Sequence, residues 1–282
     1  MIPFVKYAFI SLVAACSILG EPSYETLPDT SLQNSTFIND IHLCITNTAA
    51  IVTEPLHFSW QQWLIASGVI GGTMLSFLAD NHVKNYAKSH RLSKEKYLLD
   101  AWQIYGSPYM LAVGAGLYIA GIGFSKPLLQ ETGREALFAM VTAEAITLTL
   151  KIIFGRLPPS GNNSPKDFNF FEFHRSAWAF PSWHTTIAFA ISTVLSERIS
   201  NPYITIVLYT TAFMVGLERV YNRKHWFSDA IMGAAVGTAI GKIVVKSSVK
   251  SGSPDKQWEF LPRISSNTLG LKITYNPKFR SR

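Results

Sequence analysis

The sequence RVYNRKHWFSD, residues 219–229, decides how this chain folds and what it does, because a polar turn here joins two apolar segments. Arg219 opens the stretch, His225 follows six residues later, and Asp229 lies four residues beyond that. If the chain is helical from His225 onward, His225 and Asp229 share one face, and the carboxylate can accept a hydrogen bond from one ring nitrogen. The other ring nitrogen is then a free nucleophile, and the planar fork of Arg219 can grip two oxygens of an anion.

Two earlier stretches place similar groups at the ends of apolar segments. In PSWH, residues 181–184, Ser182 follows a proline and precedes an apolar run, which predicts a helix N-cap. Its hydroxyl and the free amides after it would form an anion site, and His184 in the first turn can protonate a leaving oxygen. Lys151 ends another apolar segment and adds a cation. The combination predicts a site that cleaves a phosphate ester without a metal.

Each of these features also has an ordinary structural explanation. A histidine four residues before an aspartate is usually a pair on a helix surface, and Pro-Ser before a helix is ordinary capping. Lys151 can simply end a helix against its dipole. The joint occurrence, with every basic and imidazole group at the boundary of an apolar segment, favours the functional interpretation.

The apolar segments predict an all-α fold built on a six-helix core bundle, membrane-embedded or membrane-associated. They cover about residues 63–79, 108–124, 135–154, 183–197, 203–217 and 226–245. Several are only about 15 to 17 residues long, roughly 22 to 26 Å against a hydrocarbon core of about 30 Å, so a spanning and a peripheral bundle both stay open. If the helices alternate, the connection at residues 80–106 lies at the same end as the three motifs.

The motifs resemble the three-part signature of the type 2 phosphatidic acid phosphatase superfamily, which also holds bacterial non-specific acid phosphatases and vanadium haloperoxidases. The family pattern is Lys-x6-Arg-Pro, then Pro-Ser-Gly-His, then Ser-Arg-x5-His-x3-Asp. This chain reads KIIFGRLPP at 151–159, PSWH at 181–184 and ERVYNRKHWFSD at 218–229. The resemblance extends from about Trp60 to about Lys246.

The resemblance implies a role for each matching residue. His225 is similar to the nucleophile that becomes phosphorylated, Asp229 to its orienting carboxylate, and His184 to the general acid. The groups that would hold the phosphate are Lys151, Ser182 and Arg219. No metal and no cofactor is implied.

Each motif departs from the family pattern at one position. Pro158 stands where the family has arginine, Trp183 replaces glycine, and Glu218 replaces serine. Arg156, two residues before Pro158, is the candidate that would reach the phosphate in place of the missing cation. Trp183 keeps its backbone amide for the phosphate while its ring narrows the pocket or covers an acyl chain. Glu218 either orients the arginine beside it or competes with phosphate for it.

Two functions follow. The first is a phosphatase that hydrolyses a phosphate monoester or diphosphate, on an envelope lipid, through a phosphohistidine intermediate. The alternative is a catalytically weakened member that binds phosphate headgroups or an envelope partner. Vanadate-dependent haloperoxidase chemistry, which reuses the same oxyanion cage, ranks below both.

Composition is consistent with a membrane-associated protein that meets anions. The chain is 48% hydrophobic and 15% charged, and 25 basic against 18 acidic residues give a net charge of +7. This excess fits phosphate esters and phospholipid surfaces. Because it is not concentrated in one region, nucleic acid is not expected as a partner.

The chain is expected to divide into four parts. Residues 1–20 form a signal peptide or N-terminal anchor, with VAAC at 13–16 resembling a lipoprotein processing site that ends at Cys16. Residues 21–58 form an extension with one amphipathic helix, residues 59–248 the bundle, and residues 249–282 a basic tail with one short strand near 269–275. The expected location is the cell envelope, as an integral membrane protein or an exported periplasmic or lipoprotein form.

Overall fold

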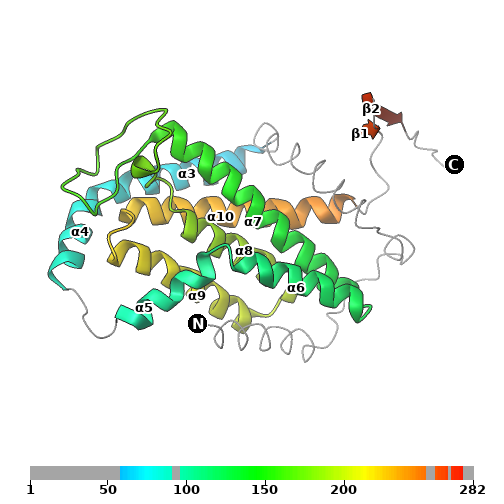
Figure 1. The fold of residues 1–282 in the computed structure, drawn as a ribbon, viewed down its shortest axis with the longest axis horizontal. Helices are drawn as coiled ribbons and strands as arrows, with labels where there is room; N and C mark the ends of the chain where they lie inside the picture. The colour runs from blue at the N-terminus through cyan, green and yellow to red at the C-terminus, as the bar shows by residue number, and fades with distance from the viewer. Residues whose placement is uncertain (1–57, 91–95, 252–257, 266–267, 276–282) are drawn as a thin grey trace.

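The computed structural model describes residues 58–90, 96–251, 258–265 and 268–275 (Figure 1). The predicted signal segment, the processing site at Cys16 and the amphipathic helix of the N-terminal extension lie outside these residues.

The six predicted helices are all present, which confirms the all-α bundle. They are α3 (Trp60–Ser76), α6 (Met110–Gly123), α7 (Pro127–Phe154), α8 (Trp183–Ile199), α9 (Pro202–Tyr221) and α10 (Phe227–Ser251). Helix α8 packs against α7, α9 and α10, and the long helices lie alongside one another in an elongated bundle (Figure 1).

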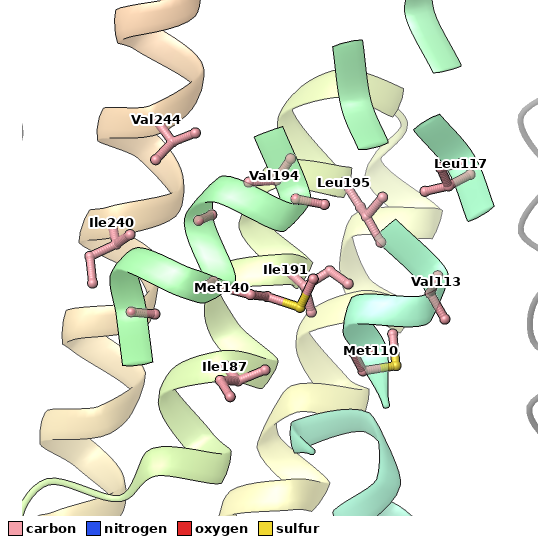
Figure 2. Close-up of a cluster of buried hydrophobic side chains, with 14 of the residues drawn as sticks. Met110, Val113, Leu117, Met140, Ile187, Ile191, Val194, Leu195, Ile240 and Val244 are labelled. Atoms are coloured by element: carbon pink, nitrogen blue, oxygen red, sulfur yellow. The ribbon is translucent and has the colours of Figure 1, made fainter. Parts of the chain in front are cut away.

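Helix α8 supplies much of the hydrophobic core. Figure 2 shows Ile187, Ile191 and Leu195 of this helix close to Met140 of α7 and to α10. Close helix approach is built into α10, because a Cβ at Gly237 would lie 2.2 Å from the Thr186 carbonyl oxygen. The glycines of the apolar segments therefore include one that the α8–α10 contact requires.

Helix α7 begins at Pro127, eight residues before the predicted start, because its first two turns carry polar side chains that interrupt the apolar pattern. Those side chains have partners in the bundle. Arg198 of α8 donates from Nη2 to Glu131 at 2.8 Å and from Nε to Glu135 at 2.7 Å, which ties the two helices together at the end opposite the motifs.

The connection at residues 80–106 is more helical than expected. It holds α4 (Asp80–Ser89), α5 (Lys96–Trp102) and the 3-10 helix η4 (Gln103–Gly106), and the 3-10 turn η3 (Phe77–Ala79) joins α3 directly to α4. The polar sequence of α4, DNHVKNYAKS, hid this helix, whose buried residues are Asp80 and Ala87. The connection does lie at the motif end, as predicted, because Asp80 bonds Arg156 of the first motif.

The outer surface of the bundle is apolar. Four stretches are long and apolar enough to cross a membrane, Trp60–Ser89, Pro127–Phe154, Pro202–Tyr221 and Phe227–Ser248. On α3 and α9 the exposed large side chains are almost all hydrophobic, including Leu64, Ile65, Leu75, Ile206 and Val207. Soluble monomers rarely expose continuous apolar surface of this size, so the bundle is a membrane-associated structure.

The tail contains a β-hairpin in place of the single predicted strand. Strand β1 (Trp258–Ser265) pairs antiparallel with β2 (Thr268–Tyr275), with Trp258 opposite Tyr275 and Ser265 opposite Thr268. The predicted strand corresponds to β2. Strand β1 was missed because Pro262 lies inside it and Leu261 interrupts its alternation of apolar and polar residues.

Candidate active site

The three motifs meet at one end of the bundle, where α7 ends, α8 begins and α9 turns into α10 (Figure 1). The Ser182 backbone N–H donates to the Asp229 carbonyl oxygen at 2.9 Å, which joins the second motif to the third. Lys151, Arg219 and His225 all lie near enough to His184 to interact with it electrostatically. The structure therefore brings the predicted nucleophile, acid and cations together.

The ring of His225 is oriented by a main-chain carbonyl. Its Nδ1 lies 2.7 Å from the Ala179 carbonyl oxygen, and since a carbonyl only accepts, Nδ1 carries the proton of the neutral ring. Nε2 then keeps its lone pair. The predicted hydrogen bond to Asp229 is not formed, because Nδ1 is 3.7 Å from Oδ2. His225 precedes α10, which begins at Phe227, so the pair does not have the helical geometry expected from its spacing.

Burial favours the neutral form of His225. Desolvation lowers the pKa of the ring below its usual value, and the neighbouring Lys151 acts in the same direction. Asp229 and the Ala179 carbonyl oppose this shift without reversing it. The ring is therefore neutral, and nucleophilic at Nε2, at pH 7.

Asp229 is held on both carboxylate oxygens. Oδ2 accepts from the Trp226 backbone N–H at 2.8 Å, and Oδ1 accepts from Arg156 Nη1. The side chain is fully buried in the first turn of α10, where the positive end of the helix dipole favours a carboxylate.

Arg156 does not replace the missing phosphate-binding arginine. Nε and Nη2 donate to the Pro165 carbonyl oxygen at 3.0 and 2.8 Å, Nη2 also donates to Asp80 at 2.6 Å, and Nη1 donates to Ser228 Oγ at 2.8 Å and to Asp229. All five N–H donors are thus engaged, and the residue is fully buried. The expectation that Arg156 contacts phosphate is wrong for this structure. It supports the carboxylate of Asp229 instead.

Three aromatic rings close over the same guanidinium. Its Cζ lies 4.2 Å from the Phe77 ring centroid and 5.3 Å from those of Phe168 and Trp226. These rings come from three different segments of the chain, so the guanidinium is sealed from water at their junction.

Asp80 is a site residue that the sequence reasoning missed. Its Oδ1 accepts from the Ser228 backbone N–H at 2.9 Å, and its Oδ2 accepts from Ser228 Oγ at 2.7 Å and from Arg156 at 2.6 Å. The available signal was its position, directly after the first apolar segment and at the same end of the bundle as the motifs.

The start of α8 offers unpaired donors. Ser182 is its N-cap residue, as predicted, and its Oγ accepts from Thr185 Oγ1 at 2.9 Å. Among the described residues, the backbone N–H groups of Trp183, His184 and Thr185 have no hydrogen-bond partner. A helix N-terminus of this kind is suited to an anion.

Glu218 orients Arg219. The carboxylate accepts from Nε and, at 2.8 Å, from Nη2 of the arginine, while Nη2 also donates to Gln103 Oε1 at 2.6 Å. Asn222 Nδ2 in turn donates to Glu218 at 2.6 Å and so fixes the carboxylate. Within the described part of the chain, Nη1 of Arg219 has no hydrogen-bond partner, which leaves two donors for an anion.

Lys151 and Trp183 complete the site. The buried Lys151 ammonium donates to the Trp178 carbonyl oxygen, so two of its three donors stay available. Trp183 packs edge-on against His184, with ring centroids 5.2 Å apart, and its indole nitrogen is buried without a partner among the described residues. Pro158 stands where the family pattern has arginine. Its carbonyl oxygen accepts a hydrogen bond from Asn163 Nδ2 at 2.9 Å, and the residue has no donor to offer a phosphate.

Comparison with known proteins assigns the motif region to a family. Residues 133–253 match the PAP2 superfamily. An 89-residue stretch is 37% identical to the Lipid A 1-phosphatase of Porphyromonas gingivalis, covering 31% of this chain and 17% of that protein. The chain therefore spans about a sixth of the length of this relative.

Two solved structures align with this chain, and the first of them has a similar fold. The PAP2-type phosphatidylglycerolphosphate phosphatase of Bacillus subtilis aligns with a TM-score of 0.50 and 18% identity, over 78% of this chain and 98% of that one. Aquifex aeolicus LpxE aligns with a TM-score of 0.48 and 26% identity, over 59% of this chain and 94% of that one. The matched residues 133–253 contain all three motifs, so the part of this chain that carries the site is similar to the PAP2 superfamily.

Proposed function

We propose that this protein is a phosphatase that removes phosphate from a lipid phosphate monoester or diphosphate through a phosphohistidine intermediate. The observation that carries the proposal is the tautomer of His225. The Ala179 carbonyl holds the proton on Nδ1, burial keeps the ring neutral, and Nε2 is the free nucleophile at the motif end of the bundle.

The mechanism has two balanced steps. His225 Nε2 attacks phosphorus, an N–P bond forms as the bond to the leaving oxygen breaks, and His184 supplies a proton to that alkoxide. Burial and the neighbouring cations lower the pKa of His184 to about 3, so the ring takes this proton from the phosphate monoanion as the substrate binds. Water then attacks the phosphohistidine with His184 as base, releasing inorganic phosphate and the free imidazole. Charge on the equatorial oxygens is met by Lys151, by Nη1 of Arg219 and by the α8 amides.

Two observations support a lipid as the substrate. The site lies at the end of a bundle whose outer surface is apolar, so a lipid headgroup in the adjoining leaflet can reach it. The stretch shared with a protein named Lipid A 1-phosphatase points in the same direction. We place the protein in the cell envelope, integral to the membrane or attached to it.

A catalytically weakened protein that binds phosphate headgroups remains the second candidate, because the cations of the site already have partners. Arg219 is shared with Glu218 and Gln103, and Lys151 with the Trp178 carbonyl. A purified sample that binds phosphate but releases none from phosphatidate, an isoprenyl diphosphate or an aryl phosphate between pH 5 and 8 would establish this alternative.

The deciding experiment is to trap the phosphorylated protein. Brief reaction with a ³²P-labelled lipid phosphate, quenched in alkali, should leave label on the wild-type chain, because phosphohistidine survives alkali. His225→Ala should abolish the label, whereas His82→Ala, which removes an exposed histidine of α4, should retain it. Label that persists in His225→Ala would refute the assigned nucleophile.

A further inference from the structure

An exposed aromatic patch lies in the connection between α7 and α8, next to the site. The run FNFFEFHR, residues 168–175, leaves Phe170, Phe171 and Phe173 exposed by 63%, 69% and 72%. Three exposed phenylalanines within four residues are unusual in a loop that faces water. We call these three residues the aromatic tip.

The tip is held in place by main-chain pairing with the end of α7. Asn169 N–H donates to the Gly155 carbonyl at 2.8 Å, and Phe171 N–H donates to the Ile153 carbonyl at 3.1 Å. Phe171 has a φ of 60°, a left-handed conformation that bulky residues seldom adopt. The surrounding structure fixes this conformation, so the exposure of the tip is built into the loop.

Ring contacts set the level of the tip along the bundle. Phe168 stacks on Phe77 with ring centroids 6.2 Å apart, and Phe170 lies 6.5 Å from Phe154, the last residue of α7. Immediately after Phe77, Leu78 is 82% exposed, and the polar helix α4 follows. The tip thus lies where the outer surface of the bundle changes from apolar to polar, the level at which aromatic side chains meet lipid headgroups.

The charges beside the tip offset one another. The exposed Lys166 and Arg175 flank it, and Asp167 and Glu172 lie in the same segment. The exposed rings, and not a net charge, therefore distinguish this surface, and aromatic rings are enriched at the level of lipid headgroups. We propose that the aromatic tip inserts into the boundary between acyl chains and headgroups of the leaflet beside the active site.

The insertion has a direct connection to the site. The same loop continues to Trp178 and Ala179, whose carbonyls hold Lys151 and His225. A loop that rests in the leaflet therefore positions the site at the depth where a lipid phosphate lies. The activity part of this inference rests on the proposed function, and the insertion does not.

Insertion is tested with an environment-sensitive label. The chain has two cysteines, Cys16 and Cys44, so a Cys16→Ser/Cys44→Ser background can carry a single NBD group at Phe171→Cys. In liposomes containing anionic lipid, NBD at position 171 should emit at shorter wavelength and be quenched by doxyl-labelled lipid. NBD at Asn162→Cys, an exposed polar position of the same loop, should remain water-like. If NBD emitted at the same wavelength as in water at both positions, the tip would not insert into lipid and the proposal would be overturned.

A second measurement separates lipid contact from general damage. Replacing all three phenylalanines of the tip by serine should lower kcat/KM for a lipid phosphate in vesicles by roughly tenfold or more, while hydrolysis of a soluble aryl phosphate stays unchanged. An equal loss on both substrates would contradict a lipid-specific role. If the wild-type protein hydrolyses neither substrate, the proposed function fails, and the NBD spectra still decide whether the tip inserts.

Discussion

Removing the carboxylate of Asp80 should weaken the whole motif end of the bundle. Asp80→Ala deletes three hydrogen-bond acceptor contacts, two to Ser228 and one to Arg156. The fully buried guanidinium of Arg156 then faces one carboxylate, that of Asp229, instead of two. Removing one partner of a buried ion pair costs about 3–5 kcal/mol because the remaining charge is left poorly compensated. We expect the free energy of unfolding to fall by that amount.

The measurement is equilibrium unfolding in mixed micelles of dodecyl maltoside and SDS, followed by tryptophan fluorescence. Asp80→Asn is the variant to compare with Asp80→Ala, because its amide oxygen can still accept a hydrogen bond from the Ser228 backbone N–H although the negative charge is lost. It should be destabilised less than Asp80→Ala. Glu197→Ala removes an exposed carboxylate of α8 and should change stability by no more than about 0.5 kcal/mol. An Asp80→Ala protein as stable as Glu197→Ala would refute the reasoning.

Three further outcomes are expected. Because burial lowers the pKa of His225, its neutral form persists below pH 6.5. The acidic limb of the plot of kcat/KM against pH should therefore lie below pH 6.5, and an acidic limb above that value would contradict a neutral nucleophile. Glu218→Ser places the residue of the family pattern at this position and removes the carboxylate that orients Arg219. The loss of this charge-assisted contact should lower kcat/KM by roughly tenfold. A higher kcat/KM would show instead that Glu218 competes with phosphate. Gly155→Ala places a Cβ 1.6 Å from the Asn169 carbonyl oxygen at a φ of 53°, so it should cost more than about 2 kcal/mol of unfolding free energy, while Gly68→Ala, which meets no atom within 4 Å, should not.

The sequence predicted the parts of the fold that depend on composition and spacing. Apolar length located the six core helices, and the motif order placed His184, His225 and Arg219 at one end of the bundle. Helix α4 was missed because most of its side chains are polar, so it does not stand out as an apolar segment. Its anchoring residue, Asp80, binds residues far along the chain and so has no local signature.

The details of the site depended on competition between donors and acceptors, which spacing cannot show. Arg156 was expected at the phosphate because of its position near Pro158, yet two carboxylates, a hydroxyl and a carbonyl engage all its donors. His225 was expected to bond Asp229, but the Ala179 carbonyl is closer to Nδ1. Every residue carries a carbonyl, so no pattern of side chains marks the one that orients the ring.

The contact between Asp80 and Arg156 also bears on where the functional unit of this chain begins. The region that matches the superfamily starts at residue 133, so Asp80 and Gln103, which support Arg156 and Arg219, fall before its border. A fragment cut at that border would keep every motif, but it would lose one of the two carboxylates that pair with Arg156 and the Gln103 amide that accepts from Arg219. We therefore expect the smallest unit to express, transplant or compare between relatives to include Asp80, which lies before the matched region.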